Sequence, residues 1–166
     1  MASVIVCRPL PVAHPDARAM LRAYFIELVD RYHGRPMPVQ EAEEAMAEFP
    51  SDDLTPFLVA YRTDEPVGCV GLRVLQPTIG ELKRMYVVPT ARRLGVGGRL
   101  IVALEDHARG QGMTELRLDT RNDLVEARAL YARHGFVEGP AHNDDPYADH
   151  WFAKNLRQPA AQTPVP

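Results

Sequence analysis

Short stretches of apolar residues, separated by clusters of Pro, Gly and Asp, predict a series of β-strands along this chain. The expected strands cover residues 3–8, 57–62, 67–75, 81–88, 115–120, 148–156 and a short segment that begins at 136. We expect Pro9 to end the first strand, because proline cannot donate a backbone hydrogen bond to a ladder. Only short turns separate the strands between residues 57 and 88, which predicts an antiparallel meander there.

Apolar residues recur at helical spacing in other stretches, and these predict a first helix between Pro15 and Gly34 and further helices over residues 40–49, 96–109 and 123–134. The first helix starts at Pro15-Asp16 and is expected to bury an apolar stripe from Ala17 to Tyr32. Asp123 and Glu126 have the spacing of a capping box at the start of the last helix. Gly135 suits the C-terminal end of that helix.

The order of these elements predicts an α+β fold in a single domain, with a central, mostly antiparallel, twisted sheet flanked by helices. The domain is expected to span residues 1–157. Residues 158–166 are rich in Pro, Ala and Gln and are expected to form a flexible C-terminal tail. A chain of 166 residues with 46% hydrophobic and 25% charged residues fits one globular domain of ordinary composition.

Charge and cysteine content narrow the class of function. The formal net charge of −3 provides no basic field for nucleic acid. No apolar run reaches the length of a membrane-spanning helix, and the N-terminus lacks an apolar secretory segment, so we expect no membrane partner and a cytoplasmic location. Cys7 and Cys69 are expected to be reduced core thiols, and the scattered histidines predict no metal site.

A glycine-rich loop at residues 92–98 lies between the strand ending near residue 88 and the helix from residue 96. Glycine tolerates positive φ and close approach of another group. A helix N-terminus presents unpaired N–H groups and the positive end of the helix dipole, which together bind phosphate. The loop is therefore either a cradle for a phosphorylated cofactor or a tight strand-to-helix turn. It lacks the lysine and hydroxyl of a P-loop, and Leu100 stands where a dinucleotide fingerprint needs glycine.

The motif Arg92-x-x-Gly95-x-Gly97 resembles the (Gln/Arg)-x-x-Gly-x-(Gly/Ala) motif of the GNAT acetyltransferase superfamily. The strand Glu-Leu-Lys-Arg-Met-Tyr-Val-Val-Pro before the loop also resembles that family. So does the later segment Ala127-x-x-Leu130-Tyr131-x-x-x-Gly135-Phe136. These motifs follow one another in the family's order from residue 81 to residue 156, whereas the first 80 residues match only in the order of their elements.

This resemblance implies a fold whose sheet is splayed at the cofactor strand, and acetyl-CoA as acyl-donor cosubstrate without a metal. In the family, loop amides hold the pyrophosphate and backbone groups of a bulged strand pair with the pantetheine arm. A further polar residue after the next strand contacts the cofactor. The corresponding residues here are Met85, Val87, Arg92, Arg93, Leu94, Gly95, Val96, Gly97, Gly98 and Asn122.

The resemblance also implies two catalytic residues. Tyr131 corresponds to the tyrosine that protonates the leaving thiolate, which is chemically reasonable because a thiol titrates near pKa ~8.5 and a phenol near ~10. Glu81 corresponds to a glutamate that takes the proton of the attacking amine, directly or through water. The oxyanion donor would be a backbone N–H near Met85 or Tyr86.

The expected activity is transfer of an acetyl group to a primary amine of a small molecule or peptide by direct attack. The alternative is a non-enzymatic acyl-CoA-binding module, and an acyltransferase for other acyl groups also stays open. Pairing through the C-terminal strands, as in relatives, would give a homodimer. Candidate acceptor-site residues lie on the first helix and near the last strands: Tyr24, Glu27, Asp30, Arg31, Tyr32, Asp144, Asp145, Tyr147 and His150.

Overall fold

Seven strands form one sheet in the order β1-β2-β3-β4-β5-β7-β6 in the computed structural model, which describes residues 4–157. The chain runs through β1 (Ile5–Leu10), α1 (Pro15–His33), α2 (Val39–Glu48), β2 (Phe57–Arg62), β3 (Glu65–Gln76), β4 (Ile79–Val87), a 3-10 turn at Pro89–Ala91, α3 (Val96–Gly110), β5 (Glu115–Thr120), α4 (Val125–Arg133), β6 (Val137–Gly139) and β7 (His150–Asn155). This order confirms the predicted α+β class. The predicted tail, 158–166, lies outside the described residues.

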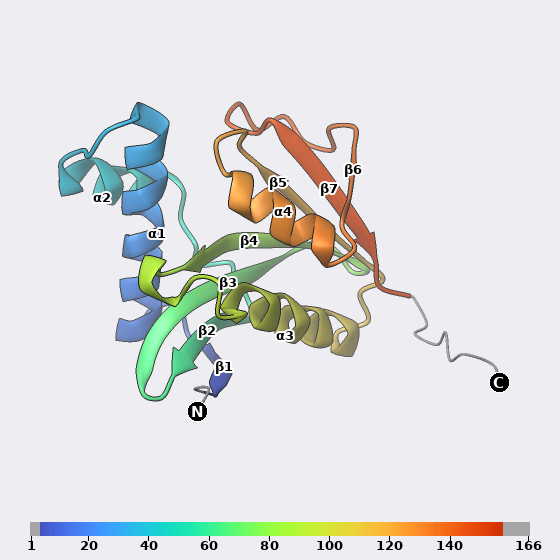
Figure 1. Ribbon diagram of the computed structural model, residues 1–166. Helices are drawn as coiled ribbons and strands as arrows, with labels where there is room; N and C mark the ends of the chain where they lie inside the picture. The colour runs from blue at the N-terminus through green and yellow to red at the C-terminus, as the bar shows by residue number, and fades with distance from the viewer. Residues whose placement is uncertain (1–3, 158–166) are drawn as a thin grey trace.

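Every neighbouring pair of strands is antiparallel except β4 and β5. The meander predicted between residues 57 and 88 is therefore confirmed as β2-β3-β4. The parallel ladder of β4 and β5 is short, with pairs at Ile79–Glu115, Gly80–Leu116 and Glu81–Arg117. Beyond Glu81 the two strands diverge, and the sheet opens into two halves (Figure 1).

Helices cover both faces of the sheet. Consecutive residues of a strand point to opposite faces, so one strand contributes side chains to two separate cores. Leu58 and Ala60 of β2 belong to a core that α3 shares with α4. Phe57, Val59 and Tyr61 alternate with them and face the core under α1. Figure 1 shows α1 and α2 beside one half of the sheet and α4 beside the other, with the opening of the sheet between them.

Three local predictions are wrong. The first strand continues through Pro9 to Leu10, which is tolerated because β1 is an edge strand and a missing N–H can face outward. Tyr32 is 58% exposed, since it lies in the last turn of α1, beyond the sheet-facing part of that helix. The predicted capping box is absent from the described structure. Leu124 is the N-cap residue of α4 and the Asp123 carboxylate accepts from Arg121 instead.

The C-terminal end of α4 agrees with its prediction. Gly135 has φ 87°, and its N–H donates to Ala132 O while the N–H of Phe136 donates to Tyr131 O. This is the Schellman arrangement, in which a left-handed residue lets two terminal carbonyls find donors. The turn directs the chain back along α4 and into β6. None of the helices within residues 4–157 has the length and apolar character needed to cross a membrane.

Candidate functional site

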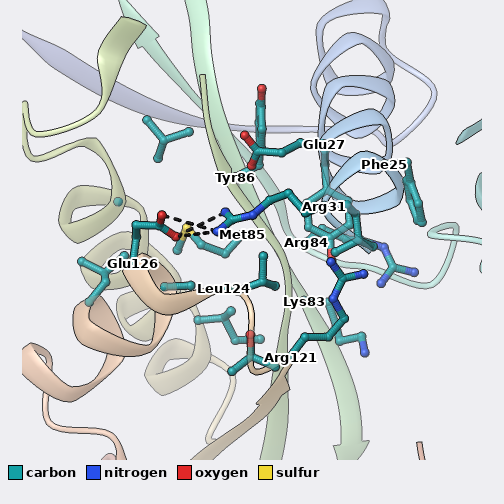
Figure 2. Close-up of a pocket in the computed structure, with 18 of the residues that line it drawn as sticks. Phe25, Glu27, Arg31, Lys83, Arg84, Met85, Tyr86, Arg121, Leu124 and Glu126 are labelled. Carbon is teal, nitrogen blue, oxygen red and sulfur yellow. Dashed lines mark hydrogen bonds and ion pairs between the residues drawn. The ribbon is translucent and has the colours of Figure 1, made fainter. Parts of the chain in front are cut away.

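A cavity of about 1390 Å³ lies where β4 and β5 diverge. Its walls come from α1 and α2 on one side, from α4 and the end of β5 on the other, and from the N-terminus of α3. Residues 82–87 of β4 run along it, and their edge toward β5 has no ladder pairs in the described chain. Figure 2 shows Met85 between Arg31 of α1 and Leu124 and Glu126 beside α4, and Tyr86 near Glu27.

A β-bulge shapes the part of β4 that faces the cavity. The register between β3 and β4 shifts between Cys69 and Gly71, and Arg84 has φ 60°, in the left-handed region that few non-glycine residues occupy. The buried Cys69 thiol donates to Arg84 O at 3.3 Å. The bulge bends β4 away from β5 and leaves its backbone groups available to a ligand.

The glycine loop places an uncapped helix N-terminus at the cavity. Gly95 is the N-cap residue of α3, has φ 82° and provides no side-chain cap. The first intrahelical donor among the neighbouring residues is Arg99, which donates to Gly95 O, so the N–H groups of residues 96–98 have no partner within the helix. Gly95, Val96, Gly97 and Gly98 line the cavity. This end of α3 therefore suits a phosphate group.

Close packing against α4 explains a second glycine of the loop. A Cβ atom on Gly97 would lie 2.7 Å from Leu130 Cδ2, so only glycine lets α3 approach α4 without a shift. The loop thus favours glycine at position 95 for its backbone angle, and glycine at position 97 spares the Leu130 side chain a shift. These are different physical requirements in one short motif.

The arginines of the loop have unequal roles. Arg92 lines the cavity, but its guanidinium donates to Val87 O at 2.9 Å and to both oxygens of Glu27 at 2.7 and 2.9 Å. It therefore fastens the end of β4 to α1, and Glu27 offsets its charge. Arg93 is exposed, lines the cavity and has φ 67°, whereas Leu94 is exposed and is not among the lining residues.

Tyr131 lies on the inner side of α4 and lines the cavity. Its ring packs edge-on against Phe136, with 5.9 Å between centroids, and in a tilted arrangement against Phe152, at 6.1 Å. Burial raises the pKa of Tyr131 well above its ordinary value, and the neighbouring Tyr24 and Asp119 raise it further. The hydroxyl is thus a proton donor and not a phenolate at neutral pH.

The structure places Glu81 beside the cavity and not among the residues that line it. Glu81 is 5% exposed and ends the short ladder with β5. Its carboxylate lies 3.4 Å from Arg73 Nη1 and 4.0 Å from Lys83 Nζ, and both of these residues line the cavity. The structure therefore links Glu81 to the cavity through two basic side chains.

Asn122 also lies outside the lining. Its side-chain oxygen is 2.9 Å from His150 Nε2, and its backbone N–H donates to Asp149 at 2.8 Å. His150 in turn contacts Glu138 at 2.7 Å. Asn122 thus ties the end of β5 to the start of β7. The residue that sequence reasoning assigned to the cofactor has a side chain engaged elsewhere.

Two contacts cross the cavity from α1. Arg31 donates to Glu126 at 3.2 Å and to Asp123 O at 2.6 Å, as the dashed lines to Glu126 in Figure 2 show. Tyr32 meets Tyr147 edge-on with ring centroids 5.7 Å apart, and Phe49 meets the same ring at 6.1 Å. Arg31 and Glu27, predicted to meet an acceptor, are thus paired with residues of the protein.

The sequence patterns assigned no role to Arg84. In the structure Arg84 lines the cavity, is 9% exposed and contacts neither Glu81 nor any other carboxylate within residues 4–157 at ion-pair distance. The signal for it was present, because the consecutive basic residues Lys83 and Arg84 interrupt the alternation of an otherwise buried strand. No cluster of three or more potential metal ligands occurs in the described part of the chain.

Comparison with solved structures supports this fold. An acetyltransferase of the GNAT family from Staphylococcus aureus has a TM-score of 0.73 at 17% identity, covering 92% of this chain and 99% of that one. The PaiA N-acetyltransferase of Thermoplasma acidophilum, solved with coenzyme A, has a TM-score of 0.71 at 20% identity with the same coverage. At these identities the likeness shows the fold alone.

Comparison at the level of sequence goes further. The IAA acetyltransferase of Azospirillum brasilense is 35% identical over 142 residues, which cover 84% of this chain and 89% of that protein. An aminoglycoside N(6')-acetyltransferase type 1 of Klebsiella aerogenes is 34% identical over 110 residues, covering 60% and 72%. Residues 19–136 match the model of the acetyltransferase (GNAT) family. The chain therefore belongs to the GNAT family of N-acetyltransferases.

Proposed function

We propose that this protein transfers the acetyl group of acetyl-CoA to a primary amine of a small molecule or peptide by direct attack of the amine. One observation carries the proposal above all others. The uncapped N-terminus of α3 faces the same cavity as the unpaired edge of β4 and the hydroxyl-bearing Tyr131. A phosphate site, a backbone edge and a proton donor are what a phosphorylated thioester substrate needs.

The residues present fit the parts of acetyl-CoA. The N–H groups of residues 95–98 would hold the pyrophosphate, with the exposed charge of Arg93 nearby. The backbone of Met85 and Val87 would hydrogen-bond the pantetheine arm as an added strand would. Arg92 would act indirectly, because its contacts with Glu27 and Val87 fix the path between β4 and the loop. Leu94 would contribute only its backbone, since its side chain points to solvent.

In the reaction, the amine nitrogen forms a bond to the acetyl carbonyl carbon and the carbon–sulfur bond breaks. A backbone N–H near Met85 would stabilise the developing oxyanion, as donors of fixed geometry do in acyl transfer. Tyr131 would give its proton to the departing sulfur. The nitrogen loses its second proton as the amide forms, and this proton would return to Tyr131 through solvent. Burial raises the Tyr131 pKa, so the hydroxyl is protonated at neutral pH when the thiolate leaves.

The amine must lose a proton before it attacks, because an alkylammonium has a pKa of about 10.4. Glu81 is the proposed acceptor of that proton. Because Glu81 does not line the cavity, the proton would reach it along water beside Lys83 rather than by direct contact. Asn122 would support the cofactor site only through the loop between β5 and α4, since its side chain is bonded to His150.

The test is release of free thiol from acetyl-CoA with a panel of amino acids, other small amines, polyamines, aminoglycosides and N-terminal peptides, beside a reaction without acceptor. We expect turnover that depends on one class of acceptor. Binding of acetyl-CoA without turnover on any acceptor would favour the alternative of an acyl-CoA-binding module. Failure to bind acetyl-CoA would contradict the proposal as a whole.

A further inference from the structure

Arg84 is a buried cation whose charge is not balanced by a carboxylate at ion-pair distance in the described chain. Its Nε donates to Ser51 Oγ at 3.1 Å and its Nη2 donates to Phe49 O at 3.2 Å, and both acceptors are neutral. A guanidinium has five N–H donors, so these contacts leave three for another partner. Burying a charge without a counter-charge is costly, which makes an anion the expected partner.

Other basic residues that line the same part of the cavity already have carboxylates. Arg73 pairs with Asp53 at 2.6 Å, and Arg121 pairs with Asp123 at 2.7 Å. Arg31 pairs with Glu126. The charge of Arg84 also helps to lower the pKa of Asp53, but the hydrogen bonds of the Asp53 carboxylate are with Arg73. Arg84 therefore carries the positive charge that the protein leaves uncompensated on this side of β4.

The backbone at Arg84 supports the same conclusion. A left-handed φ at a large, non-glycine residue is unfavourable and is usually maintained at sites with a function. Cys69 holds this conformation through its bond to the Arg84 carbonyl. The side chain lies on the α1 side of β4, where its guanidinium is 5.1 Å from the ring of Phe25 and 5.9 Å from the ring of Tyr24. Figure 2 shows Arg84 and Phe25 together beside α1.

Acidic residues also line the cavity, and their exposure decides between an anionic and a polycationic acceptor. Glu41, Glu44 and Glu48 of α2 line its rim, but all of them are exposed, so water and salt screen their charges. Arg84 is buried, and an interaction with it is screened much less. The rim can attract an ammonium group, while the buried Arg84 can bind an anion inside the cavity.

We propose that the acceptor is an amine that also carries a carboxylate, as an amino acid does, and that Arg84 binds this carboxylate. This inference rests on the proposed acetyltransferase function and names its substrate class. Arginine suits the role because its planar N–H groups match the two oxygens of a carboxylate. Arg84 directly precedes Met85, so a carboxylate on Arg84 would hold the amine near the backbone that receives the thioester.

The experiment compares matched acceptors that differ only in the carboxylate. Alanine, methionine and phenylalanine are each assayed beside their carboxamides, together with spermidine and kanamycin as polycations. The proteins are wild type, Arg84→Lys, Arg84→Met and Arg22→Met. Arg84→Lys keeps the positive charge and serves as the test variant if Arg84→Met does not fold. Arg22 is an exposed arginine of α1 outside the cavity lining and controls for loss of one positive charge.

We expect the wild type to use the free acids, and the Arg84 variants to raise KM for the acids about tenfold or more. KM for the carboxamides should change less than about threefold, because the carboxylate contact is the one removed. Each change in KM is taken relative to the wild type with the same acceptor. The different basicities of the acid and its carboxamide therefore cancel when the two changes are compared. Arg22→Met should leave both values as in the wild type.

Equal losses on acids and carboxamides, or a wild type that prefers carboxamides or polycations, would overturn the inference and leave the acetyltransferase standing. Absence of turnover with every acceptor would overturn the proposed function, and the inference with it.

Discussion

At the scale of single residues, the surroundings of Tyr131 decide in which protonation state its hydroxyl meets a substrate. Burial disfavours the charged phenolate, so the pKa of Tyr131 lies above its ordinary value of about 10. The hydroxyl therefore stays protonated throughout the range in which enzymes are assayed. A residue in this state can serve as an acid and cannot serve as a base.

Tyr131→Phe should lower kcat by about 100-fold or more, the usual contribution of general acid catalysis, with little change in KM for acetyl-CoA. In the wild type, Tyr131 should not ionise below about pH 9.5, because its pKa is raised. Its ionisation should therefore cause no fall in kcat up to that pH. Steady-state kinetics at saturating amine from pH 6 to 10 measure both. Tyr61→Phe is the control, because Tyr61 is buried but hydrogen-bonded to Asp16 outside the cavity lining. An unchanged kcat in Tyr131→Phe would remove this residue from the mechanism.

Glu81 gives a second prediction at this scale. Glu81→Gln keeps the size of the side chain but removes its capacity to take a proton. We expect kcat/KM to fall about 100-fold. We also expect its pH profile to lose the acidic limb, because in the wild type that limb would report protonation of Glu81. A pH–rate profile of the variant measures this. An acidic limb that stays where it was would show that another group, or water alone, takes the proton.

At the scale of elements, glycines control how closely β3, β4 and α3 pack. A Cβ atom on Gly68 of β3 would lie 2.8 Å from Tyr86 O and 3.2 Å from side-chain carbons of Val96 and Leu100. A backbone oxygen cannot move aside as a flexible side chain can. Gly68 is therefore required where β3 supports the beginning of α3, directly behind the glycine-rich loop.

Gly68→Ala should destabilise the protein by about 1–3 kcal/mol through overpacking. Gly110→Ala is the matched control. Gly110 lies at the end of α3 with a φ outside the positive range and no atom within 4 Å of its Cβ position. There, alanine should stabilise by about 0.4–1 kcal/mol, because it restricts the unfolded chain. Urea unfolding measures both changes. Equal stability of the two variants would show that the sheet tolerates a larger residue at position 68.

At the scale of the whole molecule, the order of elements could be predicted from sequence because each element carries its own pattern. The start of α3 at Val96 and the end of α4 before Gly135 were both found this way, since glycine marks a backbone requirement locally. The strand-to-helix loop could be predicted for the same reason. Such patterns report which face of an element is buried.

Contacts between distant parts of the chain could not be predicted in this way. Arg92 meets Glu27 across 65 residues, and Asn122 meets His150 across 28. Both contacts give a predicted cofactor residue a partner within the protein. The divergence of β4 and β5 was expected only by resemblance, because strand periodicity is the same whether or not a strand has a neighbour. The bulge of β4 was likewise expected only by resemblance, and its position at Arg84, beside the basic Lys83, was not predicted.

The most direct test of the account is an amide chemical-shift titration of the ¹⁵N-labelled protein with coenzyme A and, separately, with pantetheine, which lacks the phosphates. We predict that coenzyme A shifts the amides of Gly95, Val96, Gly97 and Gly98 together with those of Met85 and Val87. Pantetheine should shift only the two β4 amides. Shifts at β4 without any at the start of α3 in the presence of coenzyme A would contradict the phosphate site on which the account rests.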